Sequence, residues 1–200
     1  MDIHTEMSLF SGYGGFSLGL RLAGLNTRTI CYVEWDKYCQ RVLQQRFQDD
    51  PPTLTPAPIW DDIKSFDGRP WRGTVDILTA GFPCQPHSNA GLRKVARGLS
   101  DDRDLWPDCL RVISEVGPKY AILENVPGIN VGNGERPAYG GTVVGQLSEI
   151  GYDAEWRVIS AADAGAPPPQ KQVVACGALP QRLRGCFQHQ EPVSTRTPAQ

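Results

Sequence analysis

A cysteine at position 84 and a glutamate at position 124 are the side chains best placed to carry out chemistry. Cys84 stands in AGFPCQPHSNAG (80–91), directly after the apolar run VDILTA, and Glu124 ends a second apolar run forty residues later, in ENV (124–126). The ends of neighbouring parallel strands meet at one edge of a sheet, so we expect the two side chains to lie close together. A thiol nucleophile beside a carboxylic acid is suited to covalent catalysis. The ordinary alternative for a single cysteine is a small buried apolar side chain.

A glycine-rich turn and a later glutamate indicate a second kind of site. FSGYGG (10–15) precedes a helical pattern, and such a turn lets a nucleotide-like ligand approach backbone amides closely. Glu34 follows Gly15 by nineteen residues, at the end of the next predicted strand, where a carboxylate accepts hydrogen bonds from ribose hydroxyls. The turn is not GxGxxG, which favours an adenosyl ligand without a pyrophosphate. In WDDI (60–63), Asp62 and Ile63 are candidates to contact adenine, although this segment alone is also typical of a solvated turn.

The elements that must position these residues alternate between strand and helix. The predicted strands cover 7–12, 27–35, 75–82, 119–128 and 152–161, with a short strand before Asp62, and the predicted helices cover 16–23, 36–47, 105–117 and 140–151. This alternation predicts an α/β fold with a mostly parallel sheet and helices on both faces. The polar, glycine-punctuated segment 86–103 is expected to be a mobile surface loop.

Composition narrows the class of protein. The 200 residues, 40% of them hydrophobic, suit one globular domain. No apolar run approaches the length of a membrane span, and MDIHTEMSLF does not resemble a secretory signal, so a cytoplasmic location is expected. The six cysteines and three histidines form no metal-binding pattern, so no metal is expected. A net charge of −2 argues against a simple electrostatic nucleic-acid binder, but not against a local basic surface.

Taken together, FSGYGG, VEWD, DI, GFPCQ, DDRDLW and ENV resemble the successive motifs of DNA cytosine-5 methyltransferases, over about residues 7–167. The resemblance implies a Rossmann-like S-adenosylmethionine-dependent methyltransferase fold and a cytosine flipped out of duplex DNA as the methyl acceptor. It implies that the Cys84 thiolate adds to carbon 6 of cytosine while Glu124 holds and protonates ring nitrogen 3. It also implies a bacterial or phage-encoded protein, with a cognate restriction endonuclease system as a candidate partner.

The resemblance carries over to two sets of residues. The set expected to bind S-adenosylmethionine is Phe10, Gly12, Gly14, Gly15, Glu34, Trp35, Asp62, Ile63, Gly81, Phe82 and Leu105. The set expected to contact the cytosine or the DNA is Pro83, Gln85, Ser88, Arg97, Asn125 and Val126.

The chain departs from the family after about residue 167. The family has a Q-x-R-x-R segment there, but Arg182 and Arg184 follow Gln181 by one and three places, so we assign them no catalytic role. We expect residues 1–167 to form the catalytic and cofactor-binding domain, residues 168–200 to be an irregular tail, and the target recognition domain to be absent. A truncated or frameshifted gene would account for this departure. The hypothesis of a frameshift from about residue 168 is supported by PPQKQVVACG (168–177), which can be encoded so that reading one nucleotide later gives PHRSRWWLVA, a sequence closer to the family.

Two further functions stay open from the sequence. One branch of this family acts on tRNA, which makes a tRNA cytosine-5 methyltransferase an alternative. The departure after residue 167 also fits a catalytically inactive remnant that binds only cofactor or a partner chain.

Overall fold

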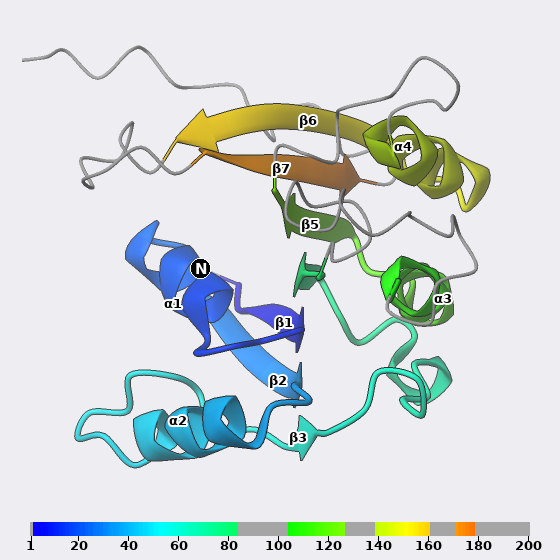
Figure 1. Ribbon diagram of the computed structural model, residues 1–200. Coiled ribbons are helices and arrows are strands. Elements are labelled where there is room, and N and C mark those ends of the chain that lie inside the picture. The colour runs from blue at the N-terminus through cyan, green and yellow to red at the C-terminus, as the bar shows by residue number, and fades with distance from the viewer. Residues whose placement is uncertain (1, 84–103, 127–138, 161–170, 179–200) are drawn as a thin grey trace, which may run out of the picture.

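A seven-stranded sheet forms the centre of the protein, with helices on both faces (Figure 1). This computed structural model describes residues 2–83, 104–126, 139–160 and 171–178, with the backbone alone for the last range. The strands, in chain order, are β1 His4–Leu9, β2 Thr27–Val33, β3 Ile59–Trp60, β4 Ile77–Gly81, β5 Tyr120–Asn125, β6 Asp153–Ser160 and β7 Lys171–Ala178. The helices are α1 Gly15–Leu22, α2 Lys37–Phe47, the 3-10 turn η1 Arg69–Trp71, α3 Trp106–Val116 and α4 Tyr139–Glu149.

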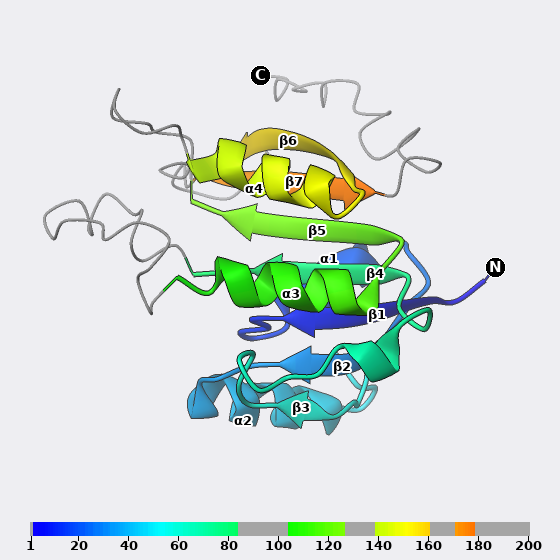
Figure 2. The ribbon, with the colours of Figure 1, turned by 90° about the vertical axis from the view of Figure 1, so that its right-hand side faces the viewer.

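The strand order in the sheet is β3-β2-β1-β4-β5-β7-β6. Strands β3, β2, β1, β4 and β5 are parallel to one another, whereas β7 runs antiparallel to both of its neighbours. Helices α1 and α2 lie on one face, and α3 and α4 lie on the other (Figures 1 and 2). The order reverses at β1 and β4, and the carboxyl ends beside such a switch point are where ligands bind in open α/β sheets. The predicted α/β class with a mostly parallel sheet and helices on both faces is therefore confirmed.

Local sequence signals explain where the helices begin and end. Asp36 caps α2, since its side chain accepts a hydrogen bond of 2.8 Å from the backbone N–H of Cys39. Pro107 stands in the first turn of α3, and Gly117 ends that helix in the left-handed conformation, with φ 62°. These elements match the predictions within a few residues.

The main core lies between the sheet and helices α3 and α4. It joins fully buried Met7 and Leu78 of the sheet to Trp106, Val112 and Ile113 of α3. A smaller cluster of Tyr32, Leu43 and Leu54 packs β2 against α2 and the loop that follows α2. Through both clusters, helices are packed against the sheet that carries the carboxyl edge.

Two expectations need correction. The first strand was expected over 7–12, but it ends at Leu9, because Phe10 and Gly12 have positive φ angles of 51° and 53° and turn the chain. The segment 168–200 was expected to be irregular, but the backbone of Lys171–Ala178 forms β7. β7 pairs in register with β5 on one side and β6 on the other, and these two ladders satisfy its backbone groups. The sheet therefore extends past residue 167.

Candidate cofactor pocket and catalytic edge

The turn between β1 and α1 is built from left-handed backbone. Phe10, Gly12 and Gly14 have φ angles of 51°, 53° and 77°. The Gly14 N–H donates to the Ser11 carbonyl at 2.8 Å, and the Ser11 hydroxyl donates to the Ser8 carbonyl at 2.8 Å. A glycine adopts these angles without strain, whereas Phe10 is held there by the surrounding turn. The result is a tight loop at the carboxyl edge of the sheet, and this loop leads directly into the N-terminus of α1.

The two glycines of this turn have different surroundings. A Cβ at Gly14 would stand 2.3 Å from Leu54 Cδ1, so close packing against the smaller core requires glycine. A Cβ at Gly12 would meet no atom within 4 Å. Gly12 therefore faces open space in which a ligand can reach the backbone.

Glu34 binds this turn with one carboxylate oxygen and the start of α2 with the other. Its Oε2 accepts a hydrogen bond of 2.7 Å from the Gly12 N–H, and its Oε1 accepts one of 2.7 Å from the Asp36 N–H. The backbone carbonyl of Glu34 accepts a further bond of 2.6 Å from the side chain of Gln40. Glu34 is buried, and these bonds fix its carboxylate where β2 ends, beside the glycine turn.

A cleft of about 300 Å³ lies at the end of β2, where it is lined by Val33 and Trp35, the residues on either side of Glu34 in the sequence. Its lining residues come from the ends of β1, β2 and β3 and from the start of α3; they are Phe10, Val33, Trp35, Asp62, Ile63, Lys64 and Leu105. Five of these residues were predicted to bind cofactor, and Val33 and Lys64 were not. Lys64 could have been found as the neighbour of Ile63, but buried Val33 lies within β2 and gives no separate signal in the sequence.

The segment that carries Asp62 and Ile63 is a pair of tight turns. Asp62 Oδ1 accepts a hydrogen bond of 2.9 Å from the Lys64 N–H, and the Phe66 N–H donates to the Ile63 carbonyl at 3.3 Å. The Ile63 side chain is buried. The alternative of a solvated turn therefore applies to only part of WDDI, because Ile63 belongs to the core and to the cleft wall.

The ends of β4 and β5 form the neighbouring part of the edge. Gly81 pairs with Glu124 in the parallel ladder, and Glu124 Oε2 lies 3.2 Å from the position of a Cβ on Gly81. Burial raises the pKa of the Glu124 carboxyl above its ordinary value, so the group keeps its proton to higher pH than an exposed glutamate. An apolar groove along α1, which includes Phe16, Leu20 and Ile122, borders the same carboxyl.

Asn125 joins these two strand ends. Its side-chain amide donates to the Phe82 carbonyl at 3.0 Å, and its Oδ1 accepts a bond of 2.8 Å from the Val126 N–H. The Phe82 ring packs on Trp106 of α3, with ring centroids 5.0 Å apart. Phe82 and Asn125 therefore fix the direction in which the chain leaves β4 toward Pro83.

The structure brings most of the predicted residues to one edge of the sheet, but not all into the cleft. Gly12 and Gly14 lie in the adjoining turn and Glu34 binds that turn, and none of the three lines the cleft. Gly81 and Phe82 lie at the Glu124 side of that edge, and Gly15 begins α1. Cys84, Gln85, Ser88 and Arg97, the loop 86–103, and Gln181, Arg182 and Arg184 fall outside the described residues. Across the described ranges, no helix has the length and apolar character needed to span a membrane, and no three metal-binding side chains gather.

The turn, Glu34 and the cleft lie together at the carboxyl edge, where open α/β sheets bind ligands. An open glycine turn lies at a helix N-terminus, a fixed carboxylate stands at the end of the second strand, and aromatic and aliphatic side chains form the walls. This fold is that of the Rossmann-like, S-adenosylmethionine-dependent methyltransferases. Within that class, the chain belongs to the family of C-5 cytosine-specific DNA methylases, which it matches over residues 4–195.

Individual relatives agree with this assignment. The chain is 31% identical over 194 residues to Type II methyltransferase M.NgoMIV of Neisseria gonorrhoeae, covering 95% of this chain and 56% of the relative. It is 32% identical over 171 residues to M.HhaI of Haemophilus parahaemolyticus, covering 84% and 46%. Its fold matches the structure of the S. pombe Dnmt2 methyltransferase with a TM-score of 0.66 at 18% identity, covering 89% and 50%. The chain thus spans about half the length of the relatives it matches.

Proposed function

We propose that this chain is the cofactor-binding and catalytic half of a DNA cytosine-5 methyltransferase that acts through a covalent Cys84 adduct. The observation that carries the proposal is the arrangement at the carboxyl edge. The strand that leads to Cys84 ends beside the carboxyl group of Glu124, next to a cleft suited to an adenosyl ligand. The proposed reaction is that of the family to which the chain belongs.

In this proposal the chain's own groups activate the cytosine ring. The Cys84 thiolate forms a bond to carbon 6 of a flipped cytosine, and Glu124 gives a proton to ring nitrogen 3 as negative charge develops there. Carbon 5 becomes nucleophilic, and S-adenosylmethionine, when bound, supplies the methyl group. Loss of the carbon 5 proton then breaks the bond between sulfur and carbon 6, and nitrogen 3 returns its proton to Glu124, which restores the ring and the acid. The raised pKa of Glu124 supports its role as the acid, because a protonated carboxyl can donate a hydrogen bond.

The cofactor side of the proposal rests on named contacts. Gly12 and the start of α1 would hold the amino-acid portion, Glu34 the ribose hydroxyls, and Asp62 with Ile63 the adenine. One lone pair on each Glu34 oxygen is used by a backbone N–H, which leaves acceptor capacity on both oxygens for a ribose diol. Trp35 is 72% exposed at the mouth of the cleft and is available to cover a bound ring.

The test is covalent trapping on duplex DNA that contains 5-fluorocytosine, with S-adenosylmethionine present. Fluorine at carbon 5 cannot leave as a cation, so the enzyme stays bound to the base. We expect an adduct that disappears in Cys84→Ala and persists in Cys39→Ala, the matched thiol control. Absence of a Cys84-dependent adduct would overturn the proposal for this chain and support the inactive remnant.

A parallel reaction with tRNA containing 5-fluorocytosine separates the second alternative. An adduct on tRNA and none on DNA would replace the DNA proposal with tRNA methylation. Because relatives are named Type II methyltransferases, we also propose a restriction-modification setting. Protection of host DNA against an endonuclease encoded beside this gene would test that setting.

The frameshift near residue 168 stays a hypothesis. The backbone of Lys171–Ala178 forms β7, and a strand at this place is compatible with either reading frame. The nucleotide sequence decides the question: a methyltransferase-like continuation in another frame would support the hypothesis, and its absence would end it.

A further inference from the structure

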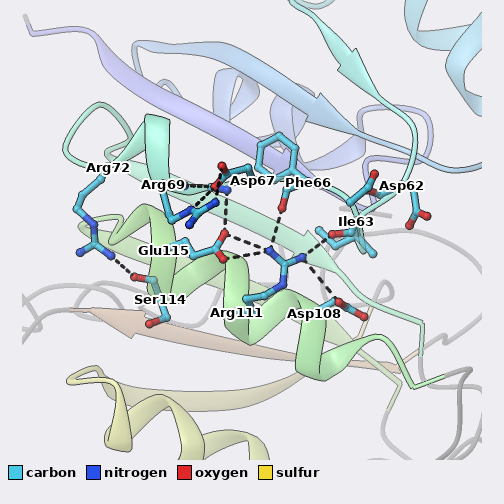
Figure 3. Close-up of polar contacts among 12 residues, drawn as sticks. Asp62, Ile63, Phe66, Asp67, Arg69, Arg72, Asp108, Arg111, Ser114 and Glu115 are labelled. Carbon is cyan, nitrogen blue, oxygen red and sulfur yellow. Dashed lines mark hydrogen bonds and ion pairs between the residues drawn. The ribbon is translucent and has the colours of Figure 1, made fainter.

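The guanidinium group of Arg111, in the middle of α3, holds the loop that forms one wall of the cleft (Figure 3). Its Nη2 donates to the Ile63 carbonyl at 2.7 Å, and its Nη1 donates to the Phe66 carbonyl at 2.8 Å. These two bonds span a sequence separation of more than forty residues. One planar group therefore fixes two successive turns of the loop that begins at Asp62.

Acidic groups on α3 hold the guanidinium in this position. Glu115 lies one helical turn from Arg111, and its carboxylate accepts bonds of 3.1 and 3.2 Å from Nη1. Asp108 lies on the other side, 3.7 Å from Nη2. The Arg111 side chain is only 34% exposed, so water competes with these contacts less than at an open surface.

Glu115 also binds the loop directly. Its Oε2 accepts a hydrogen bond of 2.8 Å from the Gly68 N–H. A Cβ on Gly68 would stand 2.9 Å from Val116 Cγ2 and 3.0 Å from Glu115 Cβ, so loop and helix are in close contact there. Arg111 and Glu115 together hold the loop between residues 63 and 68 at a fixed distance from α3.

The start of helix α3 also contributes to this cleft. Leu105, directly before the first residue of α3, lines the cleft together with Asp62 and Ile63. The contacts of Arg111 therefore set the spacing between Leu105 and the Asp62 side of the cleft. A change at Arg111 alters this spacing without removing any side chain that lines the cleft.

We propose that Arg111 is a positioning residue that sets how Asp62 and Ile63 meet the base of the adenosyl ligand, and so sets discrimination at the 6-position of the purine. This inference rests on the proposed function, since it assumes an adenosyl ligand in the cleft. Arg111 does not touch the ligand. It acts through the Ile63 and Phe66 carbonyls, and thus on the placement of the Asp62 carboxylate, which would accept a bond from the adenine amino group.

The experiment compares two ligands by calorimetry: S-adenosylhomocysteine and S-inosylhomocysteine, in which a carbonyl replaces the 6-amino group. We expect the protein to bind the adenosyl form about tenfold more tightly, the effect of about one hydrogen bond to a charged acceptor. In Arg111→Met this ratio falls toward one. In Arg111→Lys it falls partway, because an ammonium group cannot hold both carbonyls in a planar fork. Asp62→Ala serves as the reference, because it gives the ratio of the two affinities when the contact between Asp62 and the base is absent.

Arg72→Met is the matched control. Arg72 donates to the Ser114 carbonyl of α3 at 2.7 Å (Figure 3). It is not among the residues that line the cleft. Its removal should leave the ligand ratio unchanged, while the melting temperature of each variant reports any general loss of stability. If Arg111→Met does not fold, Arg111→Lys decides.

The possible results separate the two proposals. If the protein binds neither ligand, the proposed function fails. If it binds with a preference for adenine, and the folded Arg111 variants keep the full preference, the positioning role of Arg111 is wrong and the proposed function stands.

Discussion

The Glu124 carboxylate lies against the backbone of Gly81, with Oε2 3.2 Å from the position that a Cβ on Gly81 would occupy. The two residues are register partners at the carboxyl ends of adjacent parallel strands. The missing side chain on β4 therefore provides the space for the acidic group on β5. In the proposed reaction, a substrate base would lie against this contact.

A methyl group at Gly81 should displace the Glu124 carboxyl. We expect Gly81→Ala to move Oε2 toward solvent, to lower the pKa of Glu124 toward the ordinary glutamate value, and to reduce the free energy of unfolding by about 1 kcal/mol through overpacking. Carbon-13 NMR titration of the glutamate carboxyl groups measures the pKa. Gly145→Ala, on α4, is the control, since a Cβ there meets no atom within 4 Å. An unchanged Glu124 titration in Gly81→Ala would contradict the prediction.

Replacing Glu124 itself should separate activity from stability. The folded-state pKa of Glu124 is raised, so its stabilising contribution is complete below the unfolded-state pKa and is lost as the pH rises through the folded-state value. Glu124→Gln carries no charge, so we expect a higher free energy of unfolding at neutral pH. The same variant lacks the acid for nitrogen 3, so adduct formation should slow by about 100-fold or more. Urea unfolding and trapping kinetics give the two values; a loss of stability at pH 7 would refute the first expectation.

A second buried carboxyl group offers a pH test away from the site. Glu6, fully buried in β1, accepts hydrogen bonds from the hydroxyls of Ser17 and Thr79 at Oε1 and of Thr29 at Oε2. Burial raises its pKa, and the three hydroxyl groups offset this only in part. Because the pKa of Glu6 is raised in the folded state, as that of Glu124 is, its contribution to stability falls as the pH rises above the unfolded-state pKa. Between pH 5 and pH 8, the free energy of unfolding should therefore fall less in Glu6→Gln than in the natural chain.

Thr29→Val tests the bonding around Glu6 directly. It removes the hydroxyl that donates to Oε2 at 2.6 Å and leaves that oxygen buried. We expect a loss of about 1–3 kcal/mol in the free energy of unfolding, measured at pH 7. In the Glu6→Gln background the loss should be smaller, because a neutral amide needs the donor less. Equal losses in both backgrounds would show that the hydroxyl acts independently of the carboxylate.

The two glycines of the β1–α1 turn should give different phenotypes. Gly14→Ala places a methyl group 2.3 Å from Leu54, so we expect several kcal/mol of destabilisation, seen in urea unfolding. Gly12→Ala has room for the methyl group and suffers only the cost of its positive φ, about 1 kcal/mol. The methyl group would, however, occupy the space proposed for the ligand, so binding of S-adenosylhomocysteine should weaken about tenfold or more. Normal binding by Gly12→Ala would argue against that ligand placement.

Local patterns in the sequence predict much of this fold. Alternating apolar runs and helix caps such as Asp36 give the parallel strands and their helices, and the position of Glu34 after β2 places it at the ligand edge. The contacts of Arg111 with Ile63 and of Glu124 with Gly81 join residues far apart in the chain, and such contacts leave no local periodicity. They become visible only once the packing of α3 and the strand register are known.

β7 was missed for a related reason. KQVVACGA is short and stands among prolines and glutamines, and its own preference for a strand is weak. It becomes a strand because β5 and β6 offer it a hydrogen-bonding ladder on each side. Tertiary pairing overrides weak local propensity in such a case.

The place of β7 also sets the order in which the sheet can be completed. β6 pairs with β7 and has no ladder with β5, so β6 cannot join the sheet until residues up to 178 are available. Until then the edge of β5, with apolar Ala121 and Leu123, presents unpaired amides and carbonyls to other chains. We therefore expect a growing polypeptide to pass through a period when this edge can pair wrongly with a second molecule.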